Sequence, residues 1–82
     1  MQNWEHCTLR LYYWGIEIIY HKPSGRVTRE IRFKRGQDWE EALSTAIGKL
    51  GLEGWEAFAV QGVKDVEGGL PEYIYFKRPL TP

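Results

Sequence analysis

Three scarcities in the sequence restrict what the protein can be. Cysteine occurs once, at Cys7, so no internal disulfide can form and a reducing compartment is expected. No stretch approaches the roughly 18 apolar residues of a membrane span, and no basic-then-apolar signal opens the chain. Lys plus Arg and Asp plus Glu number 11 each, so long-range charge attracts neither nucleic acid nor acidic lipid. We therefore expect a cytoplasmic protein without membrane association.

Groups that carry catalysis or bind metals are also scarce. His6 and Cys7 are neighbours in an alternating stretch, so on a strand they point to opposite faces and cannot form a dyad. Together with His21 they do not approach a metal-ligand pattern. Gly68-Gly69 follows charged residues and opens no helix, which argues against a phosphate cradle. The sequence thus predicts no catalytic residue, metal or cofactor, and we expect the protein not to be an enzyme.

Aromatic side chains, by contrast, are abundant. They make up 15% of the 82 residues and include four tryptophans. A chain of this length forms one domain, which we expect to span residues 1–82 with residues 79–82 as a frayed tail. Its stability margin is small, so the loss of one core side chain should matter.

One amphipathic helix is predicted over residues 39–50. Its apolar stripe recurs at spacings of three and four and consists of Trp39, Leu43, Ala46, Ile47 and Leu50. Asp38 and Glu41 match a capping box, and Gly51 is the expected left-handed residue after the last turn. Gly48 is costly inside a helix and suggests close approach to a sheet. A stripe this narrow covers one sheet face and does not build a bundle.

Four strands are predicted around this helix. Residues 4–20 alternate, and the apolar parity changes at Gly15, which we interpret as a β-bulge in one long strand. A turn at residues 22–25 folds the chain back and places Tyr20 opposite Val27. Two further strands, residues 55–61 and 72–77, follow the helix.

These elements predict an α+β domain built as β-hairpin–helix–β-hairpin. The sheet is expected to be four-stranded and antiparallel, in the order 2-1-3-4, with one helix packed on one face. The alternative order 2-1-4-3 would need a parallel pair and ranks second.

Three short stretches resemble a known family. They are Trp4-Glu5, the run Leu-Gly-Leu-Glu-Gly-Trp-Glu at residues 50–56, and Tyr-Phe-Lys-Arg-Pro at residues 75–79. In these stretches the chain is similar to members of domain of unknown function 4177, which carry Leu-Gly-x-Glu-Gly-Trp-Glu after a helix and close with Phe-Lys-Arg-Pro. The resemblance implies a small α+β domain. It implies no activity and no catalytic residues.

The sheet face away from the helix is the candidate binding surface. On the parities above it carries the aromatic residues Trp4, Tyr12, Trp14, Trp55, Tyr73 and Tyr75, interleaved with Arg10, Arg32, Lys34 and Lys77. A monomer rarely leaves a contiguous patch of large aromatics in water. We therefore predict that a partner binds there, and the candidate contact residues are Trp4, Arg10, Tyr12, Trp14, Arg32, Trp55, Tyr73 and Tyr75.

Three interpretations of this face compete. In the first, the chain self-associates into a dimer or larger homo-oligomer, or binds another protein, and so covers the rings. In the second, the rings stack on single-stranded nucleic acid while the Arg and Lys side chains follow its backbone. In the third, the parity of the first strand is inverted, and Trp4 and Trp14 wrap the helix ends as core residues.

Overall fold

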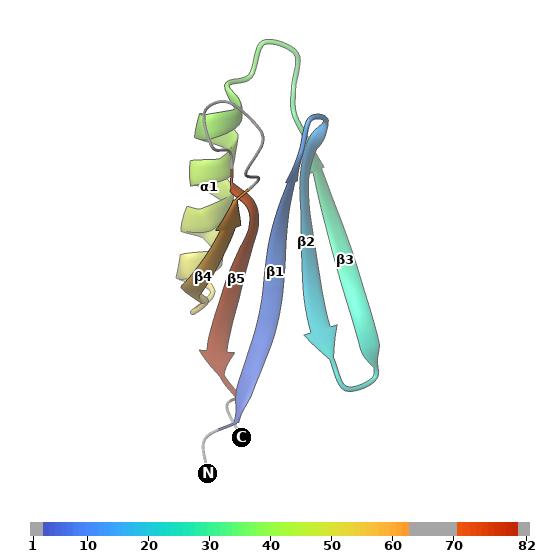
Figure 1. The fold of residues 1–82 in the computed structure, drawn as a ribbon, viewed down its shortest axis with the longest axis vertical. Helices are drawn as coiled ribbons and strands as arrows, with labels where there is room; N and C mark the ends of the chain where they lie inside the picture. Colours follow the sequence, from blue (N-terminus) through green and yellow to red (C-terminus); the bar gives the residue numbers. More distant parts are fainter. Residues whose placement is uncertain (1–2, 63–70, 81–82) are drawn as a thin grey trace.

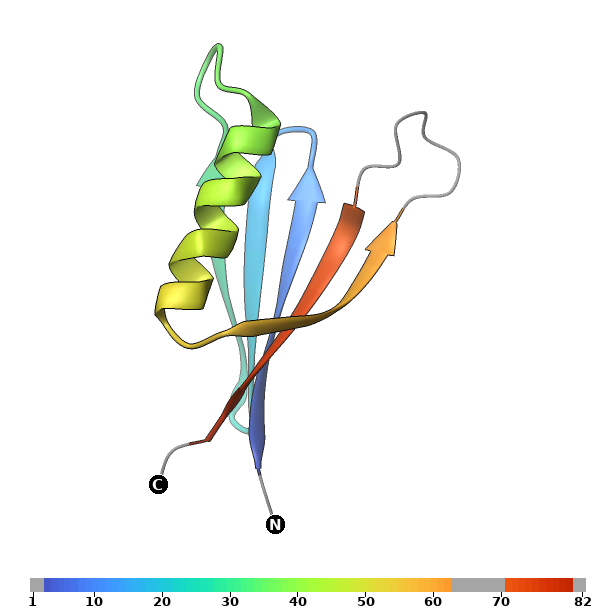
Figure 2. The ribbon, with the colours of Figure 1, turned by 90° about the vertical axis from the view of Figure 1, so that its left-hand side faces the viewer.

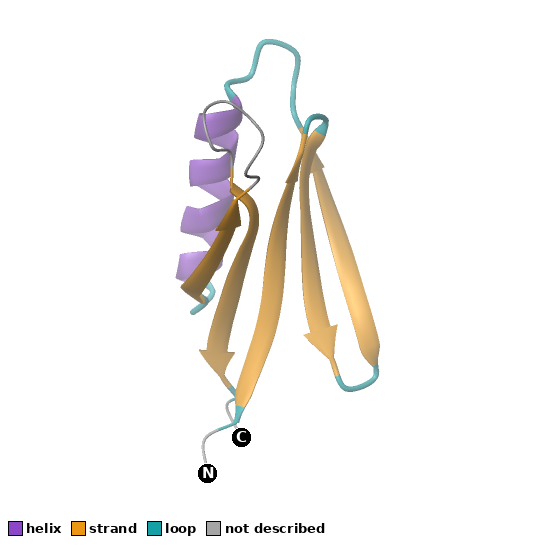
Figure 3. Ribbon diagram, viewed as in Figure 1, coloured by secondary structure: helices purple, strands orange, loops and turns teal. Residues whose placement is uncertain are grey.

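The computed structural model describes residues 3–62 and 71–80. The elements are β1 (Trp4–Tyr12), β2 (Gly15–Lys22), β3 (Gly25–Arg32), α1 (Trp39–Leu52), β4 (Glu56–Gly62) and β5 (Pro71–Pro79). The strands form one antiparallel sheet in the order β3-β2-β1-β5-β4. The helix lies on one side of this sheet, as Figures 1 and 3 show.

The sheet has five strands, so the prediction of four is wrong. The predicted first strand, residues 4–20, is a hairpin: Tyr12 pairs with Gly15 across a two-residue turn. A bulge and this turn both exchange the faces on which odd and even residues lie, so the apolar pattern does not distinguish them. The turn is also hidden because Tyr13 and Trp14 are not typical turn residues.

The reversal at Tyr13 also decides the strand order. β5, not β4, lies next to β1, so the predicted order 2-1-3-4 is wrong. The second-ranked order, 2-1-4-3, has the correct neighbours. The parallel pair that it implies does not arise among the described strands, because β1 runs opposite to β2 and both neighbours of β1 are antiparallel to it. The predicted register between the strands around the Pro23-Ser24 turn is confirmed, with Tyr20 opposite Val27.

The core lies between α1 and the sheet face beneath it. The sheet supplies Cys7, Leu9, Ile16, Ile18, Ile74 and Phe76, and the helix supplies Ala42, Leu43, Ala46 and Leu50. In β1 and β2 these are the residues whose alternation the sequence shows. Figure 2 shows α1 in front of the sheet, with the ends of β4 and β5 extending beyond it.

Both helix ends are built by local capping. At the N-terminus the Asp38 carboxylate accepts a hydrogen bond from the backbone N–H of Glu40 at 3.1 Å, which confirms the predicted cap residue. At the C-terminus the backbone N–H groups of Gly54 and Trp55 donate to the carbonyls of Gly51 and Leu50. This is a Schellman ending, in which Gly54 has the positive φ of 89°. The prediction of Gly51 in this role is wrong by three residues.

Gly15 and Gly48 differ in how closely other atoms approach them. A Cβ on Gly15 would overlap the backbone carbonyl oxygen of Ile31 in β3, whereas nothing lies within 4 Å of a Cβ on Gly48. The expectation that Gly48 marks close approach to the sheet is therefore wrong, because Gly48 lies on the exposed side of α1.

This contrast predicts opposite effects of one substitution. Gly15→Ala should lower the free energy of unfolding by about 2 kcal/mol or more, because β2 and β3 must separate to admit the methyl group. Gly48→Ala should raise it by up to about 1 kcal/mol through helix propensity. Urea unfolding followed by circular dichroism measures both. Equal stability of the two variants would contradict the close strand approach at Gly15.

Candidate functional site

The sheet face away from α1 carries a connected row of rings and cations, which we call the ring face. Its rings are Trp4, Tyr12, Trp14, Phe58, Tyr73 and Tyr75, and its cations are Arg10, Arg32 and Lys77. Antiparallel pairing of β1 with β5 brings the central residues of this face together, because Arg10 lies opposite Tyr73. Residues directly opposite on paired strands share a face.

Arg10 lies at the centre of the ring face. Its guanidinium carbon is 4.8 Å from the ring centroid of Tyr12 and 4.9 Å from that of Tyr73. Each of these rings is also stacked on a second one: Tyr12 on Trp14 at 4.9 Å and Tyr73 on Tyr75 at 6.1 Å. One cation therefore links two stacked pairs from different strands, and each contact of this kind stabilises by about 0.5–1 kcal/mol at exposed sites.

Two further cations occupy the ends of the ring face. Arg32 of β3 lies over Trp14, with 5.1 Å between its guanidinium carbon and the ring centroid. At the other end, Lys77 Nζ lies 4.5 Å from the centroid of Trp4 and 5.7 Å from that of Phe58. All three cations thus lie against rings, and Arg32 also forms an ion pair with Glu30 at 3.9 Å.

Hydrogen bonds hold two of the rings in place. The Tyr12 hydroxyl donates to Glu17 Oε1 at 3.2 Å, and the Tyr75 hydroxyl donates to Gln61 Oε1 at 3.1 Å. Desolvation, together with the Glu17 carboxylate, raises the pKa of Tyr12 above 10.0. Tyr12 is therefore a neutral donor at physiological pH.

Seven of the eight predicted contact residues lie on the ring face or at its edge. Trp55 does not, so its assignment to this face is corrected: it is 7% exposed and belongs to the core under α1. The Schellman ending at Gly54 directs it there, next to Leu50. Lys34 lies beyond the end of β3 and outside the sheet.

Phe58 is the ring that sequence reasoning missed. The pairing between β4 and β5 shifts by one residue between Ala57 and Ala59, so Phe58 is the extra residue of a β-bulge. Its ring centroid lies 6.0 Å from that of His6 and 6.4 Å from that of the ring-face residue Tyr75. Regular alternation from Trp55 onward predicts that Phe58 lies on the helix side, and no turn residue in the sequence signals the bulge.

The structure contradicts the inverted parity of the first strand. Cys7 and Leu9 are buried under α1, whereas Trp4 is 39% exposed and neither Trp4 nor Trp14 belongs to the core. The rings of β1 therefore lie on the side that α1 does not cover.

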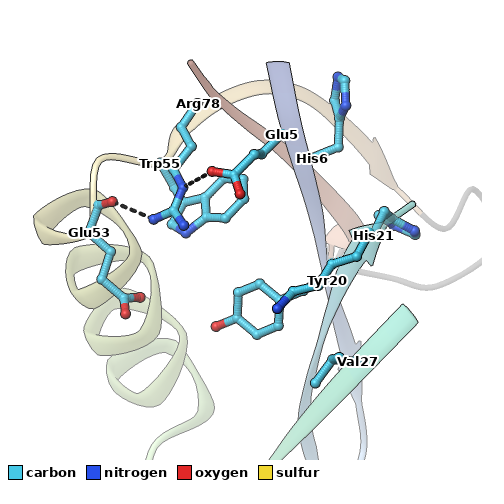
Figure 4. A pocket seen from close by; sticks show the side chains of 9 residues that line it. Glu5, His6, Tyr20, His21, Val27, Glu53, Trp55 and Arg78 are labelled. Atoms are coloured by element: carbon cyan, nitrogen blue, oxygen red, sulfur yellow. Dashed lines mark hydrogen bonds and ion pairs between the residues drawn. The ribbon is translucent and has the colours of Figure 1, made fainter. Parts of the chain in front are cut away.

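A pocket of about 310 Å³ lies on the opposite, helix side of the sheet. Figure 4 shows Trp55, Tyr20, Glu5 and Arg78 around it, whereas the His6 and His21 rings point away. The Arg78 guanidinium carbon is 4.2 Å from the Trp55 ring centroid. Arg78 also donates to Glu5 Oε2 at 2.6 Å and to the backbone carbonyl of Glu53 at 2.8 Å.

Arg78 thus connects three parts of the chain: β1, β5 and the end of α1. It lies between this pocket and a second hollow of about 370 Å³ lined in part by Gly54 and Pro79. Because its charge is paired with Glu5 and its plane covers Trp55, we assign Arg78 a structural role. The sequence signals none of these contacts, since Glu5 and Arg78 are 73 residues apart.

Cys7 is a buried core residue. Burial, opposed by the nearby charge of Arg78, raises the pKa of the thiol from 9.0 to about 12. Thiolate is the nucleophilic and metal-binding form, so this cysteine is unreactive at neutral pH. In the described part of the chain, no three His, Cys, Asp or Glu side chains are placed to hold a metal, and no helix could span a membrane.

No protein-family model, curated protein or solved structure matches this chain. The resemblance to domain of unknown function 4177 therefore stays a prediction.

The Cys7 environment predicts low thiol reactivity in the folded state. At pH 8 the native protein should react with iodoacetamide about a thousandfold more slowly than the urea-unfolded chain, because a pKa of about 12 suppresses the thiolate. Mass spectrometry of timed alkylation measures the rates. Equal native and unfolded rates would contradict the burial of Cys7.

The folded protein binds the Cys7 thiol proton more tightly than the unfolded chain does, so the free energy of unfolding should fall as pH rises from 9.0 toward about 12.

Arg78→Lys should lower the free energy of unfolding by about 1 kcal/mol, because an ammonium cannot stack on Trp55 and bond both Glu5 and Glu53. The matched control is Arg35→Lys, at an exposed loop residue, which should change stability little. Thermal unfolding measures both, since about 1 kcal/mol corresponds to a shift in Tm of about 4–8 °C in a domain of this size. Equal Tm values for the two variants would refute the structural role of Arg78.

Proposed function

We propose that the protein is a non-enzymatic module that associates with itself, or with another protein, through the ring face. The observation that carries the proposal is the connected row of rings and cations on a sheet face that no described helix covers. Tyr, Trp and Arg are the residues enriched in the energetically dominant centres of protein interfaces. Their mutual stacking on the ring face also reduces the entropy lost when a partner binds.

The same geometry weakens the alternative of single-stranded nucleic acid. Stacked bases need ring faces that are free, and each stacked base contributes about 1–3 kcal/mol. A stacked ring and a guanidinium carbon both lie within 5 Å of the Tyr12 centroid, and Trp14 has Tyr12 and Arg32 as its neighbours. Little room for bases therefore remains on these two rings, which favours a protein partner.

The proposal predicts a homo-oligomer that depends on ring-face tyrosines. At about 50 µM the protein should sediment as a dimer or larger species, and Tyr73→Ser should weaken association at least about tenfold. The matched control is Tyr13→Ser, because Tyr13 is 96% exposed in the β1–β2 turn and belongs to no ring contact of the described chain. Sedimentation velocity across a dilution series measures both variants.

A protein that is strictly monomeric at this concentration would exclude self-association. Tryptophan fluorescence titrated with mixed-sequence oligonucleotides at low salt completes the test, since electrostatic binding is strongest there. If oligonucleotides quench the fluorescence of the wild-type protein but not that of Tyr73→Ser, the result would support nucleic-acid binding over the proposed function.

A further inference from the structure

The two edges of the sheet are chemically different. The β3 edge carries four charged side chains along eight residues: Arg26, Arg29, Glu30 and Arg32. Such charges protect an edge from pairing with another strand. The β4 edge has no charged side chain from Ala57 to Gln61, and all of its residues are exposed. Two apolar side chains there, Phe58 and Val60, are 51% and 64% exposed.

Because of the bulge, the side chains of β4 do not alternate regularly between the two faces of the sheet. Ala57 and Val60 lie opposite Phe76 and Ile74, on the helix side of the sheet. Phe58 and Ala59, between them, lie on the other side: Phe58 contacts ring-face residues, and Ala59 lies opposite Tyr75. The order along the strand is therefore helix side, ring face, ring face, helix side. This order reads the same in both directions.

A strand with such an order can pair antiparallel with a copy of itself. If the two-fold axis passes between Phe58 and Ala59, Phe58 lies opposite Ala59 of the second copy. Ala57 then lies opposite Val60 of the second copy, so every opposed pair shares a face, as antiparallel pairing requires. Glu56 lies opposite Gln61 of the second copy, so no like charges are opposed.

The bulge favours a second copy as the partner. A regular strand can follow β4 past Phe58 only by leaving Phe58 unpaired, as β5 does on the other side. Bulges are among the features that protect sheet edges. A second copy carries the same irregularity at the matching position, and it satisfies the whole strand.

We propose that the β4 edge joins two copies of this chain, with the strands antiparallel and centred between Phe58 and Ala59. The pairing makes one continuous sheet across both copies, with the two α1 helices on the same side. It is isologous and closes at two copies. The two ring faces become one wider surface, but the pairing itself does not depend on what binds them.

Oligomer mass under edge substitution tests the proposal. Ala59→Lys places a charge at the centre of the pairing and should shift the protein toward half its wild-type mass at about 100 µM, a concentration suited to small interfaces. The matched control is Thr28→Lys, a small-to-lysine change on the β3 edge, which should leave the mass unchanged. An unchanged mass for Ala59→Lys, or an equal loss in both variants, would overturn the proposal.

Cross-linking tests the register independently of any loss of folding. Mixed Ala57→Cys and Val60→Cys proteins should form a disulfide between the two variants under mild oxidation, because these positions are opposed. Neither variant alone should do so, since identical positions lie about 10 Å apart along the strands and disulfides need Cα atoms within about 7 Å. Native Cys7 is buried and does not compete. Absence of the mixed disulfide, or equal yields of all three species, would refute the register.

The mixed disulfide and the effect of Tyr73→Ser separate the two interfaces, whereas Ala59→Lys also places a charge opposite the ring-face residue Tyr75. Loss of the edge contact alone leaves the effect of Tyr73→Ser on association intact, and loss of the ring-face contact alone leaves the mixed disulfide intact. If both contacts form, the wild-type protein is a tetramer and each class of variant is a dimer.

Discussion

One constraint governs the structure: a single helix can cover only one face of a sheet. Because side chains alternate along a strand, the residues that α1 buries leave an equal number on the other side. In β1 this separates Cys7 and Leu9 from Arg10 and Tyr12. The buried side acquires its stability from apolar contact with the helix. The uncovered side must be stabilised by its own residues.

The ring face shows how these residues do so. Rings that would be exposed singly are stacked in pairs, and cations lie over them, so much of the aromatic surface is shielded within the chain. Arg10 acts between β1 and β5, and Lys77 acts between Trp4 and Phe58. The result is a mixed aromatic and cationic surface. Side chains that already contact one another lose less entropy when a partner binds, which supports the proposed contact surface.

The end of α1 illustrates a second use of arginine on the other side of the sheet. The Schellman ending turns Trp55 into the core, and Arg78 then covers the indole and bonds to Glu5 and to the carbonyl of Glu53. A cation stacked on a ring thus supports the fold here, whereas on the ring face similar contacts prepare a surface. The difference is that Arg78 also bonds to the end of α1 and so connects the sheet to the helix.

The sequence by itself determined the fold class, the helix and its Asp38 cap, and the apolar sides of β1 and β2, because these follow from spacing within short segments. It also determined that Tyr12, Tyr73 and Tyr75 lie on the side away from the helix. Only the tertiary structure decided that residues 4–20 form a hairpin, since a turn and a bulge change the side-chain parity alike. It alone placed β5 beside β1, Trp55 in the core and Phe58 among the rings. Trp55 is in the core because the helix ending has its positive-φ residue at Gly54 and not at Gly51, two glycines that the sequence pattern does not distinguish. The strand order and the place of Phe58 depend on contacts between strands and on one backbone irregularity, which leave no local pattern in the sequence.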